Sequence, residues 1–446
     1  MNGRTAGWVA EAAQARLAAG DPDADGPRRA VVDTRELARG DLFVGLRGER
    51  ADGGELAGDA LRAGAWGALV APEHEQRAVS AAEALAPGAP VVLTAADPLV
   101  SLQRLARAWR RALGCKVVGV TGSTGKTSTK DILTALLAPH LRTHANRENL
   151  NTEIGLPLTI LEAGPRTEAM VLEMAMRGEG QIAELVEVAE PDVGVIVNVG
   201  PVHLELLGTV ERVAAAKAEL IRDLRPGAAC VVPASEPLLD AHLREDLDTI
   251  TFGPGGEVML LSFDAGRAEI ESRGRTIELE LPYTEPYNLL NTLAAVGAAT
   301  ALGVRPVGGV DVRFSSLRGE VVELPGGVTV VNDCYNANPM SMRAALQHLA
   351  ESTAERRLAV LGTMAELGPA SEAFHREIGE EAAALGVDVL VTVGQEALAY
   401  SEGFGGESYA AATPEEAAAL LEELAIPGDR VLVKGSRSAG LERILA

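Results

Sequence analysis

The chain has 446 residues, and its 63 acidic side chains outnumber 40 basic ones, which gives a net charge of −23. Hydrophobic residues make up 47% and aromatic residues 3%, so the length and composition predict about three globular domains with aliphatic cores. The acidic balance argues against an extended nucleic-acid or anionic-membrane surface, because both attract basic patches.

No segment of the sequence predicts export or membrane insertion. The apolar runs end before they reach the roughly 20 residues that cross a bilayer, and the N-terminal stretch lacks the apolar core of a signal peptide. Cys115, Cys230 and Cys334 lie too far apart for a zinc knuckle and do not make a disulfide framework. We therefore expect a cytoplasmic protein with no nucleic-acid partner and no membrane insertion.

Residues 1–97 are expected to form a small N-terminal α/β domain. A helical stretch covers Glu55–Ala63, and a connection rich in Gly, Pro and Ala at residues 86–98 ends the block. The strand-length aliphatic runs are Ala30–Val32, Leu42–Leu46, Ala68–Ala71 and Val91–Thr94.

Residues 98–311 are expected to form a central domain. Its near-continuous aliphatic strands alternate with segments of helical period, and this pattern is typical of a parallel sheet covered by helices on both faces. Residues 257–281 alternate polar and apolar side chains, which predicts antiparallel strands. The predicted parallel strands are Lys116–Thr121, Ala169–Met174, Val193–Val199 and Ala229–Pro233.

Residues 312–446 repeat the α/β rhythm and are expected to form a Rossmann-like C-terminal domain. Thr413 followed by Pro414 and Glu416 predicts a capping box at the start of a helix that runs to Leu424. Ligands of such sheets bind at the carboxyl ends of the strands. The predicted strands are Val328–Asn332, Arg357–Leu361, Val387–Val393 and Arg430–Lys434.

The strongest local signal is a strand, a Gly-rich turn and a helix start over residues 117–128. The two glycines let backbone N–H groups face oxyanions, and the helix N-terminus adds partial positive charge. Lys126 is expected to bridge the β- and γ-phosphates and Thr127 to bind Mg²⁺. Val120 stands where the strict pattern has Gly, so the loop is a shortened variant. The predicted triphosphate site comprises Gly122, Ser123, Thr124, Gly125, Lys126, Thr127 and Ser128.

Three further ionisable residues stand out in the central block. Glu173 ends a predicted strand, where either a second Mg²⁺ contact or a helix cap or surface acid fits. His203 follows the next strand, and a metal or phosphate contact and a satisfied loop residue both fit it. Lys217 lies in the middle of an apolar helical stripe. It either snorkels to the sheet's edge, pairs with phosphate, or forms a CO₂ adduct whose carbamate ligates metal.

Together these residues resemble the Mur ligase family of ATP-dependent amide-bond-forming enzymes, over nearly the whole chain. The stretch Thr121–Thr127 is similar to the family's shortened phosphate loop. The resemblance implies ATP and two Mg²⁺ ions as cofactors, with the lysine carbamylated. The implied metal ligands are Thr127, Glu173, His203 and Lys217, and the implied catalytic residues are Lys126, Glu173, His203 and Lys217.

Other stretches are similar to those family members that join D-alanyl-D-alanine to UDP-N-acetylmuramoyl-tripeptide in peptidoglycan synthesis. They are Asn149–Gly155, Asn332–Pro339, Leu361–Gly368 and Lys434–Arg437. The resemblance implies that Thr34 and Arg35 contact the UDP-sugar. It also implies that Asn288 and Asn291 lie near the adenine and that Arg318 and Asp333 reach ATP from the third domain. The remaining implied substrate contacts are Asn149, Asn151, Thr152, Tyr335, Asn336, Asn338, Lys434 and Arg437.

Four positions depart from the family pattern. Gly54 and Tyr287 stand where His is usual, Ala175 where Gly is usual, and Thr363 where Asp is usual. Tyr287 and Thr363 bear on the finer ATP and amine contacts, whereas the phosphate and metal set is complete.

The expected reaction activates a carboxylate as an acyl phosphate, which an amine then attacks with loss of phosphate. We expect a monomer with small-molecule substrates. The alternatives are a sister ligase that adds a single amino acid, a P-loop NTPase acting as a switch or kinase, and a non-catalytic nucleotide-binding scaffold. The sequence leaves open whether the tripeptide ends in diaminopimelate or lysine.

Overall fold

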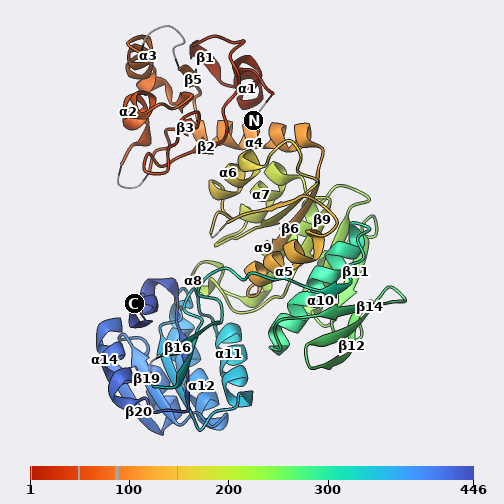
Figure 1. Ribbon diagram of the computed structural model, residues 1–446, viewed down its shortest axis with the longest axis vertical. Coiled ribbons are helices and arrows are strands. Elements are labelled where there is room, and N and C mark those ends of the chain that lie inside the picture. The colour runs from red at the N-terminus through yellow and green to blue at the C-terminus, as the bar shows by residue number, and fades with distance from the viewer. Residues whose placement is uncertain (2, 49–50, 86–89, 148, 325, 446) are drawn as a thin grey trace.

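The computed structural model describes residues 1, 3–48, 51–85, 90–147, 149–324 and 326–445. They form three α/β lobes, each built around its own sheet (Figure 1). Within these residues the sheets have five, ten and six strands from the first lobe to the third. The expected fold class of three α/β domains is confirmed.

The first lobe has the strand order β1-β5-β4-β3-β2, with β1 antiparallel to β5 and the other pairs parallel. Alternate side chains point to opposite faces, so Phe43 packs against α2 and α3 whereas Leu42 packs against α1 and α4. Residues 86–89 of the predicted connection lie outside the described residues, and the remainder contains β5. The elements are α1 (Ala6–Ala13), β1 (Arg16–Ala19), β2 (Ala30–Val31), β3 (Leu42–Val44), α2 (Ala57–Arg62), β4 (Gly67–Val70), α3 (Glu75–Glu83) and β5 (Val91–Thr94).

The central sheet has the order β15-β14-β13-β12-β11-β10-β9-β6-β8-β7 and is parallel from β7 to β12. The predicted antiparallel segment forms β12, β13 and β14. Helices α5 and α10 cover one face, and α4, α6, α7 and α9 cover the other. The strands are β6 (Lys116–Thr121), β7 (Thr143–Ala145), β8 (Ala169–Glu173), β9 (Val193–Ile196), β10 (Ala229–Pro233), β11 (Asp248–Phe252), β12 (Val258–Asp264), β13 (Arg267–Ser272), β14 (Arg275–Glu280) and β15 (Gly308–Gly309). The helices are α4 (Pro98–Leu113), α5 (Lys126–Leu137), α6 (Gly155–Glu162), α7 (Gln181–Ala189), α8 (Leu204–Leu207), α9 (Val210–Asp223) and α10 (Pro286–Ala301).

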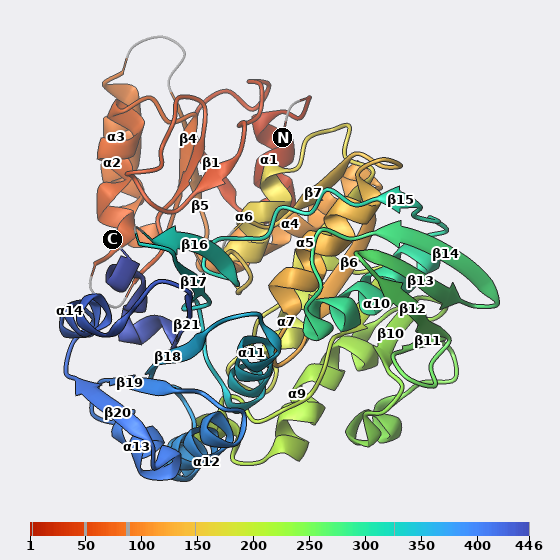
Figure 2. The ribbon, with the colours of Figure 1, turned by 60° about the horizontal axis from the view of Figure 1, so that its bottom comes forward.

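The third sheet has the order β16-β17-β21-β18-β19-β20, and only β16 is antiparallel to its neighbour among the described strands. Helices α11, α12 and α13 cover one face and α14 covers the other (Figure 2). The strands are β16 (Glu320–Leu324), β17 (Val328–Asn332), β18 (Arg356–Gly362), β19 (Val389–Val393), β20 (Glu407–Ala411) and β21 (Asp429–Lys434). The helices are α11 (Pro339–Glu351), α12 (Ser371–Ala384), α13 (Leu398–Phe404) and α14 (Pro414–Leu424).

Helix α14 begins where its sequence signature predicts. The Thr413 hydroxyl caps it by accepting the backbone N–H of Glu416 at 3.2 Å. In a capping box the Glu416 carboxylate would accept the N–H of the cap residue Thr413. Here it accepts the N–H of Ala412, one residue earlier, at 2.8 Å.

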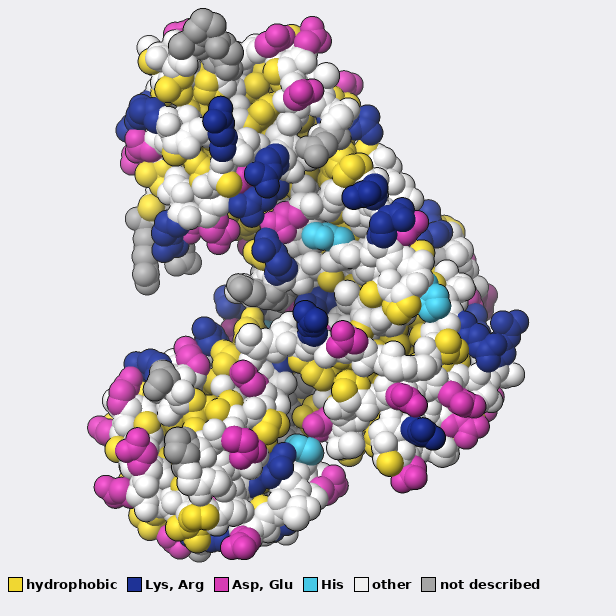
Figure 3. Space-filling view, in the orientation of Figure 1, with side chains coloured by type: hydrophobic (Ala, Val, Ile, Leu, Met, Phe, Trp, Pro, Cys, Tyr) yellow, Lys and Arg dark blue, Asp and Glu magenta, His cyan; other side chains and the backbone are white. Residues whose placement is uncertain are grey.

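Two observations concern the surface of the described chain. None of its helices combines the length and hydrophobicity needed to cross a bilayer. The space-filling view shows a hollow between the first and third lobes, bordered by Lys and Arg side chains and also by Asp and Glu side chains (Figure 3).

Candidate functional site

Three neighbouring parallel strands end together at one edge of the central sheet. Val120 on β6 pairs with Glu173 on β8, and Thr121 pairs with Ile196 on β9. The segments that follow these strands therefore meet at the same edge, as expected for the ligand-binding side of a parallel sheet.

The phosphate loop joins β6 to α5 at this edge. Gly125 has the left-handed φ of +74°, and a Cβ at this position would lie 2.5 Å from the side-chain oxygen of Asn291. Both the backbone conformation and the close approach therefore require glycine. Asn291 on α10 donates to the side chain of Asn288 at 3.4 Å, so the predicted asparagine pair lies against the loop.

Four of the predicted residues form one connected set. The Thr127 hydroxyl donates to Glu173 at 2.7 Å, and the Asn151 amide donates to the other oxygen of that carboxylate at 2.8 Å. Arg318, from the segment that precedes β16, donates to the Thr127 hydroxyl at 3.0 Å. The structure thus joins the phosphate loop, the end of β8 and the start of the third lobe.

Lys126 lies half-buried beside this set. Its ammonium donates to the backbone carbonyl of Gly122 at 2.9 Å. Burial lowers the pKa of Lys126, and the charge of Arg318 lowers it further, whereas Glu173 opposes the shift. The loop therefore holds a cation that has no direct carboxylate partner among the described residues.

Lys217 on α9 is 2% exposed, so it does not snorkel to solvent. It forms no hydrogen bond or ion pair with any other described residue. Burial, together with the positive charge of Lys126, lowers the pKa of Lys217 well below its ordinary value. The side chain is consequently biased toward the neutral amine.

His203 precedes the short helix α8 and has a left-handed backbone, with φ of +53°. Its Nδ1 contacts the carboxylate of Glu366 in the third lobe. Glu173 has other partners, and the described residues contain no group of three or more His, Cys, Asp or Glu side chains that could hold a metal. His203 is thus placed at the boundary between two lobes.

The third lobe contributes a second cluster near Arg318. Lys434 is 2% exposed and donates to the Asp333 carboxylate at 2.5 Å and to the Asn336 carbonyl at 3.0 Å. The guanidinium of Arg318 lies 4.1 Å from the centre of the Tyr335 ring. Asn338 caps α11, in a capping box with Ser341.

Other predicted residues stand apart from these clusters. Arg35 is 88% exposed and pairs with Asp33 of its own turn, so the first lobe's candidates Thr34 and Arg35 do not contact the phosphate loop. Arg437 pairs with Glu442 at 3.4 Å. Asn149 and Thr152 are exposed on either side of Asn151.

Tyr287 also has a structural place, although it departs from the family pattern. Its ring packs edge-on against His348 of α11, with the ring centres 6.3 Å apart. Burial raises the pKa of Tyr287 well above its ordinary value. The residue therefore joins the central and third lobes as a neutral aromatic contact.

Comparisons with known proteins agree with this arrangement. The Mur ligase middle domain matches residues 120–299, and the Mur ligase glutamate ligase domain matches residues 317–437. The UDP-N-acetylmuramoyl-tripeptide–D-alanyl-D-alanine ligase of Synechocystis is 35% identical over 93% of this chain and 90% of its own. The chain belongs to the Mur ligase family.

Three further similarities to Mur ligases extend over nearly the whole length. The ligase of the same name from Bacillus subtilis is 34% identical, covering 93% of this chain and 92% of its own. The crystal structure of MurF from Acinetobacter baumannii superposes with a TM-score of 0.85 at 28% identity and covers 99% of this chain and 98% of its own. MurF from Thermotoga maritima, determined in complex with ADP, gives 0.78 at 33% identity, with coverage of 94% and 96%.

Sequence reasoning missed three residues that hold this Mur ligase site together. The Asn198 side chain accepts the N–H groups of Ser123 at 3.1 Å and Thr124 at 2.9 Å, and it donates to the Thr124 hydroxyl at 3.0 Å. Asn146 accepts the N–H of Glu173 at 2.9 Å and donates to its carbonyl at 3.0 Å. Lys130 in turn donates to the Asn146 carbonyl at 2.9 Å. Only their positions could have indicated them, since Asn198 lies near the carboxyl end of a predicted strand and Lys130 lies one turn after Lys126.

Proposed function

We propose that this protein is an ATP-dependent ligase that joins D-alanyl-D-alanine to UDP-N-acetylmuramoyl-tripeptide in peptidoglycan precursor synthesis. The observation that carries the proposal is the linked set of Thr127, Glu173 and Arg318, with Lys126 beside it, within a chain that is similar to ligases of this name over 93% of its length. The set joins a phosphate loop to a carboxylate and to an arginine of another lobe.

The reaction proceeds in two balanced steps. A carboxylate oxygen of the tripeptide attacks the γ-phosphorus of ATP, and ADP leaves as the acyl phosphate forms. The amine of D-alanyl-D-alanine then attacks the acyl carbon, phosphate leaves, and the amine nitrogen loses a proton. The ATP is required because a carboxylate is a poor electrophile and phosphate is a good leaving group.

The residues around the loop supply binding and charge. The backbone N–H groups of residues 125–127 at the start of α5 face the phosphates, and Lys126 turns from the Gly122 carbonyl to a phosphate oxygen. Arg318 adds a second cation from the third lobe. These groups neutralise the oxyanions of a loose phosphoryl-transfer transition state.

The oxygen donors at the edge fit Mg²⁺, which prefers hard oxygen ligands. Thr127 and Glu173 already lie within hydrogen-bond distance of each other, and neither oxygen is held by a lysine. When bound, Mg²⁺ supplies charge neutralisation and Lewis acidity at the phosphate oxygens. We place a second ion at His203 and at a carbamate on Lys217.

The carbamate follows from the environment of Lys217. A buried amine without an anionic partner in the described chain is held as a nucleophile by its lowered pKa. Attack of Nζ on CO₂ with loss of one proton gives an anionic carbamate with two oxygens. An anionic carbamate on Lys217 would attract the Lys126 ammonium, whereas a protonated Lys217 would repel it.

The substrates are anions although the protein is acidic. The hollow between the first and third lobes is bordered by basic side chains (Figure 3), and we place the UDP end of the substrate on its first-lobe side at Thr34 and Arg35. The dipeptide is placed on the third-lobe side, near Tyr335, Asn336 and Arg437. We further propose that one chain acts alone, as a monomer in the cytoplasm.

The decisive experiment measures phosphate release and product mass with ATP, Mg²⁺, the tripeptide substrate and D-alanyl-D-alanine. We expect phosphate release only when all components are present, and an adduct of the tripeptide and the dipeptide. Running the assay with diaminopimelate- and lysine-containing tripeptides identifies the preferred acceptor.

Different outcomes identify the alternatives. Turnover with a single amino acid in place of the dipeptide indicates a sister ligase, and phosphate release without a peptide acceptor indicates an NTPase. Nucleotide binding without any turnover indicates a scaffold. Each of these results contradicts the proposal.

A further inference from the structure

The contact between His203 and Glu366 joins two lobes through two unusual backbone positions. Both residues are non-glycine residues in the left-handed region, with φ of +53° and +63°. The backbone carbonyl of Glu366 also accepts the N–H of Glu205 at 3.2 Å, and Arg177 lies 3.5 Å from the Glu366 carboxylate. Residues held in this region cluster at functional sites.

The loop that carries Glu366 is fixed by buried side chains of its own lobe. His375, which is fully buried, accepts the N–H of Met364 at 2.9 Å, and Ser436 accepts the N–H of Ala365 at 2.9 Å. The hydroxyl of Tyr400, also fully buried, donates to the Gly362 carbonyl at 3.1 Å. The carboxylate is therefore presented from a rigid loop.

Ser436 connects three of the motif segments of the third lobe. It belongs to the segment Lys434–Arg437, contacts the loop Leu361–Gly368, and donates to the carbonyl of Ala337 at 3.4 Å. Ala337 lies in the segment Asn332–Pro339. All three motifs thus converge on the support of one loop, a role that ATP binding alone does not require.

The contact also distinguishes the two ring nitrogens of His203. In a neutral imidazole, a carboxylate beside Nδ1 favours the tautomer with its proton on Nδ1, which leaves the lone pair on Nε2. Nε2 forms no hydrogen bond within the described part of the chain. Metal-binding histidines commonly have this arrangement, in which a carboxylate orients the ring and raises its basicity.

We propose that Glu366 is a positioning residue that orients the His203 imidazole so that Nε2 faces the metal, and that docking of the third lobe thereby completes the metal site. The inference rests on the proposed function, because it takes His203 as a metal ligand. It adds a role for the Leu361–Gly368 loop and couples metal affinity to the arrangement of two lobes.

The test measures Mn²⁺ binding in the full-length protein with a non-hydrolysable ATP analogue. Electron paramagnetic resonance counts free Mn²⁺, and electron spin echo modulation detects nitrogen bound to the ion. The variants are Glu366→Ala, Glu366→Gln and His203→Ala. Glu372→Ala is the matched control on the same lobe, because Glu372 is exposed and, among the described residues, its carboxylate pairs with Arg376 alone.

We expect Glu366→Ala to weaken Mn²⁺ binding by roughly 10-fold or more and to reduce the nitrogen signal. Glu366→Gln, which still accepts a hydrogen bond, should recover part of both. In steady-state assays Glu366→Ala should raise the KM for Mg²⁺ more than it lowers kcat at saturating Mg²⁺. Glu372→Ala should behave as the unmodified protein does.

Two results overturn the inference. Unchanged or tighter Mn²⁺ binding in Glu366→Ala, while His203→Ala abolishes the nitrogen signal, means that Glu366 is neutral or competes with the metal. An unchanged nitrogen signal in His203→Ala means that His203 is not a ligand, and it overturns the metal set as well. Failure of the proposed ligase function can be distinguished from failure of this inference, because it is detected in the phosphate-release assay of the unmodified protein.

Discussion

Asn198 is the single residue that holds most of the phosphate loop in place. Its side chain satisfies two N–H groups of the loop and one hydroxyl, while Ser123 makes its own bonds to Gly200. The loop is therefore organised before a nucleotide arrives, and little conformational freedom remains to be lost on binding.

We expect Asn198→Ala to raise the Kd for ATP about tenfold, since each hydrogen bond contributes about 1 kcal/mol and the freed loop must be ordered on binding. Isothermal titration with a non-hydrolysable analogue measures the change. Asn198→Asp is the matched control for the donor half of the interaction, because it keeps the acceptor oxygens. A Kd within twofold of the unmodified value in Asn198→Ala would show that the loop is ordered by other contacts.

Substitution of Lys217 tests the proposed carbamate. Lys217→Ala removes the proposed carbamate, so we expect phosphate release to fall at least a hundredfold and to recover partly with added acetate or formate. A carboxylate that diffuses into the vacated space supplies the missing oxygens. Lys217→Met fills the same space and should show no recovery. Equal responses of the two variants to acetate would contradict the carbamate role.

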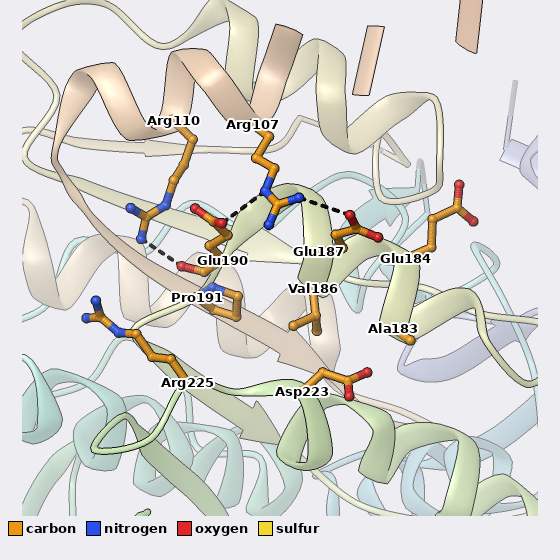
Figure 4. Close-up of a pocket in the computed structure, with 10 residues that line it drawn as sticks. All are labelled: Arg107, Arg110, Ala183, Glu184, Val186, Glu187, Glu190, Pro191, Asp223 and Arg225. Carbon is orange, nitrogen blue, oxygen red and sulfur yellow. Dashed lines mark hydrogen bonds and ion pairs between the residues drawn. The ribbon is translucent and has the colours of Figure 1, made fainter. Parts of the chain in front are cut away.

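Helices α4 and α7 show how charges organise elements away from the site. Between them and the end of α9 lies a cavity of about 780 Å³ lined mainly by charged side chains (Figure 4). Arg107 on α4 reaches Glu187 and Glu190, each at 2.9 Å, and Arg110 donates to the backbone carbonyl of Glu190 at 2.7 Å. These pairs join two helices that cover the same face of the sheet.

The lowered pKa of Glu190 predicts that the free energy of unfolding depends on pH. The Arg111 guanidinium and then Arg107 lower this pKa, so the folded state favours the charged carboxylate. The stabilisation is present above the ordinary pKa of Glu and is lost as pH falls through the lower folded value. We expect Glu190→Gln to reduce the free energy of unfolding by about 1 kcal/mol at pH 7, since both arginines are partly exposed.

Urea unfolding of both proteins at pH 7 and at successively lower pH below 4.5 tests this. The difference between them should shrink as the carboxylate of the unmodified protein becomes protonated. Glu187→Gln, which removes a more exposed partner of Arg107, serves as the control and should have a smaller effect. A difference that persists at the lowest pH would show that shape rather than charge joins the helices.

The elements that the sequence predicts are those with continuous aliphatic runs. Strands β6, β8 and β17 are buried on both faces, so composition alone identifies them. Strands β16 and β20 were missed because they lie at sheet edges and are half exposed, so their residues carry no such run. Lys126 and Thr127 belong to a local motif, whereas Asn198 and Glu366 act through contacts distant in sequence, which one sequence does not reveal.

The first and central lobes share one hydrophobic cluster, whereas the clusters of the third lobe are its own. One cluster extends from the first sheet through α1 and α4 to the face of the central sheet that α4, α6, α7 and α9 cover. Within it the rings of Trp8 and Trp109 meet edge-on, with their centres 6.3 Å apart. The third lobe has two clusters of its own. Its described links to the central lobe include polar contacts such as Arg318 with Thr127 and Ser315 with Asp131.

We therefore expect two thermal transitions, one for the first and central lobes together and one for the third lobe. Differential scanning calorimetry of the full chain measures them. A Mg²⁺ complex of a non-hydrolysable ATP analogue, bound as we propose, would contact both units, so it should raise the lower transition and bring the two closer. A single transition without nucleotide, with equal calorimetric and van't Hoff enthalpies, would contradict this division.

The position of helix α4 in the chain affects how the first lobe folds during synthesis on the ribosome. It covers the face of the first sheet that α2 and α3 leave open, yet it follows every strand of that sheet in the chain. The nascent first lobe therefore emerges with this apolar face covered by α1 alone, and it completes its core only after residues 98–113 have left the exit tunnel. The third lobe, with both faces covered by its own helices, has no such dependence on later or earlier segments.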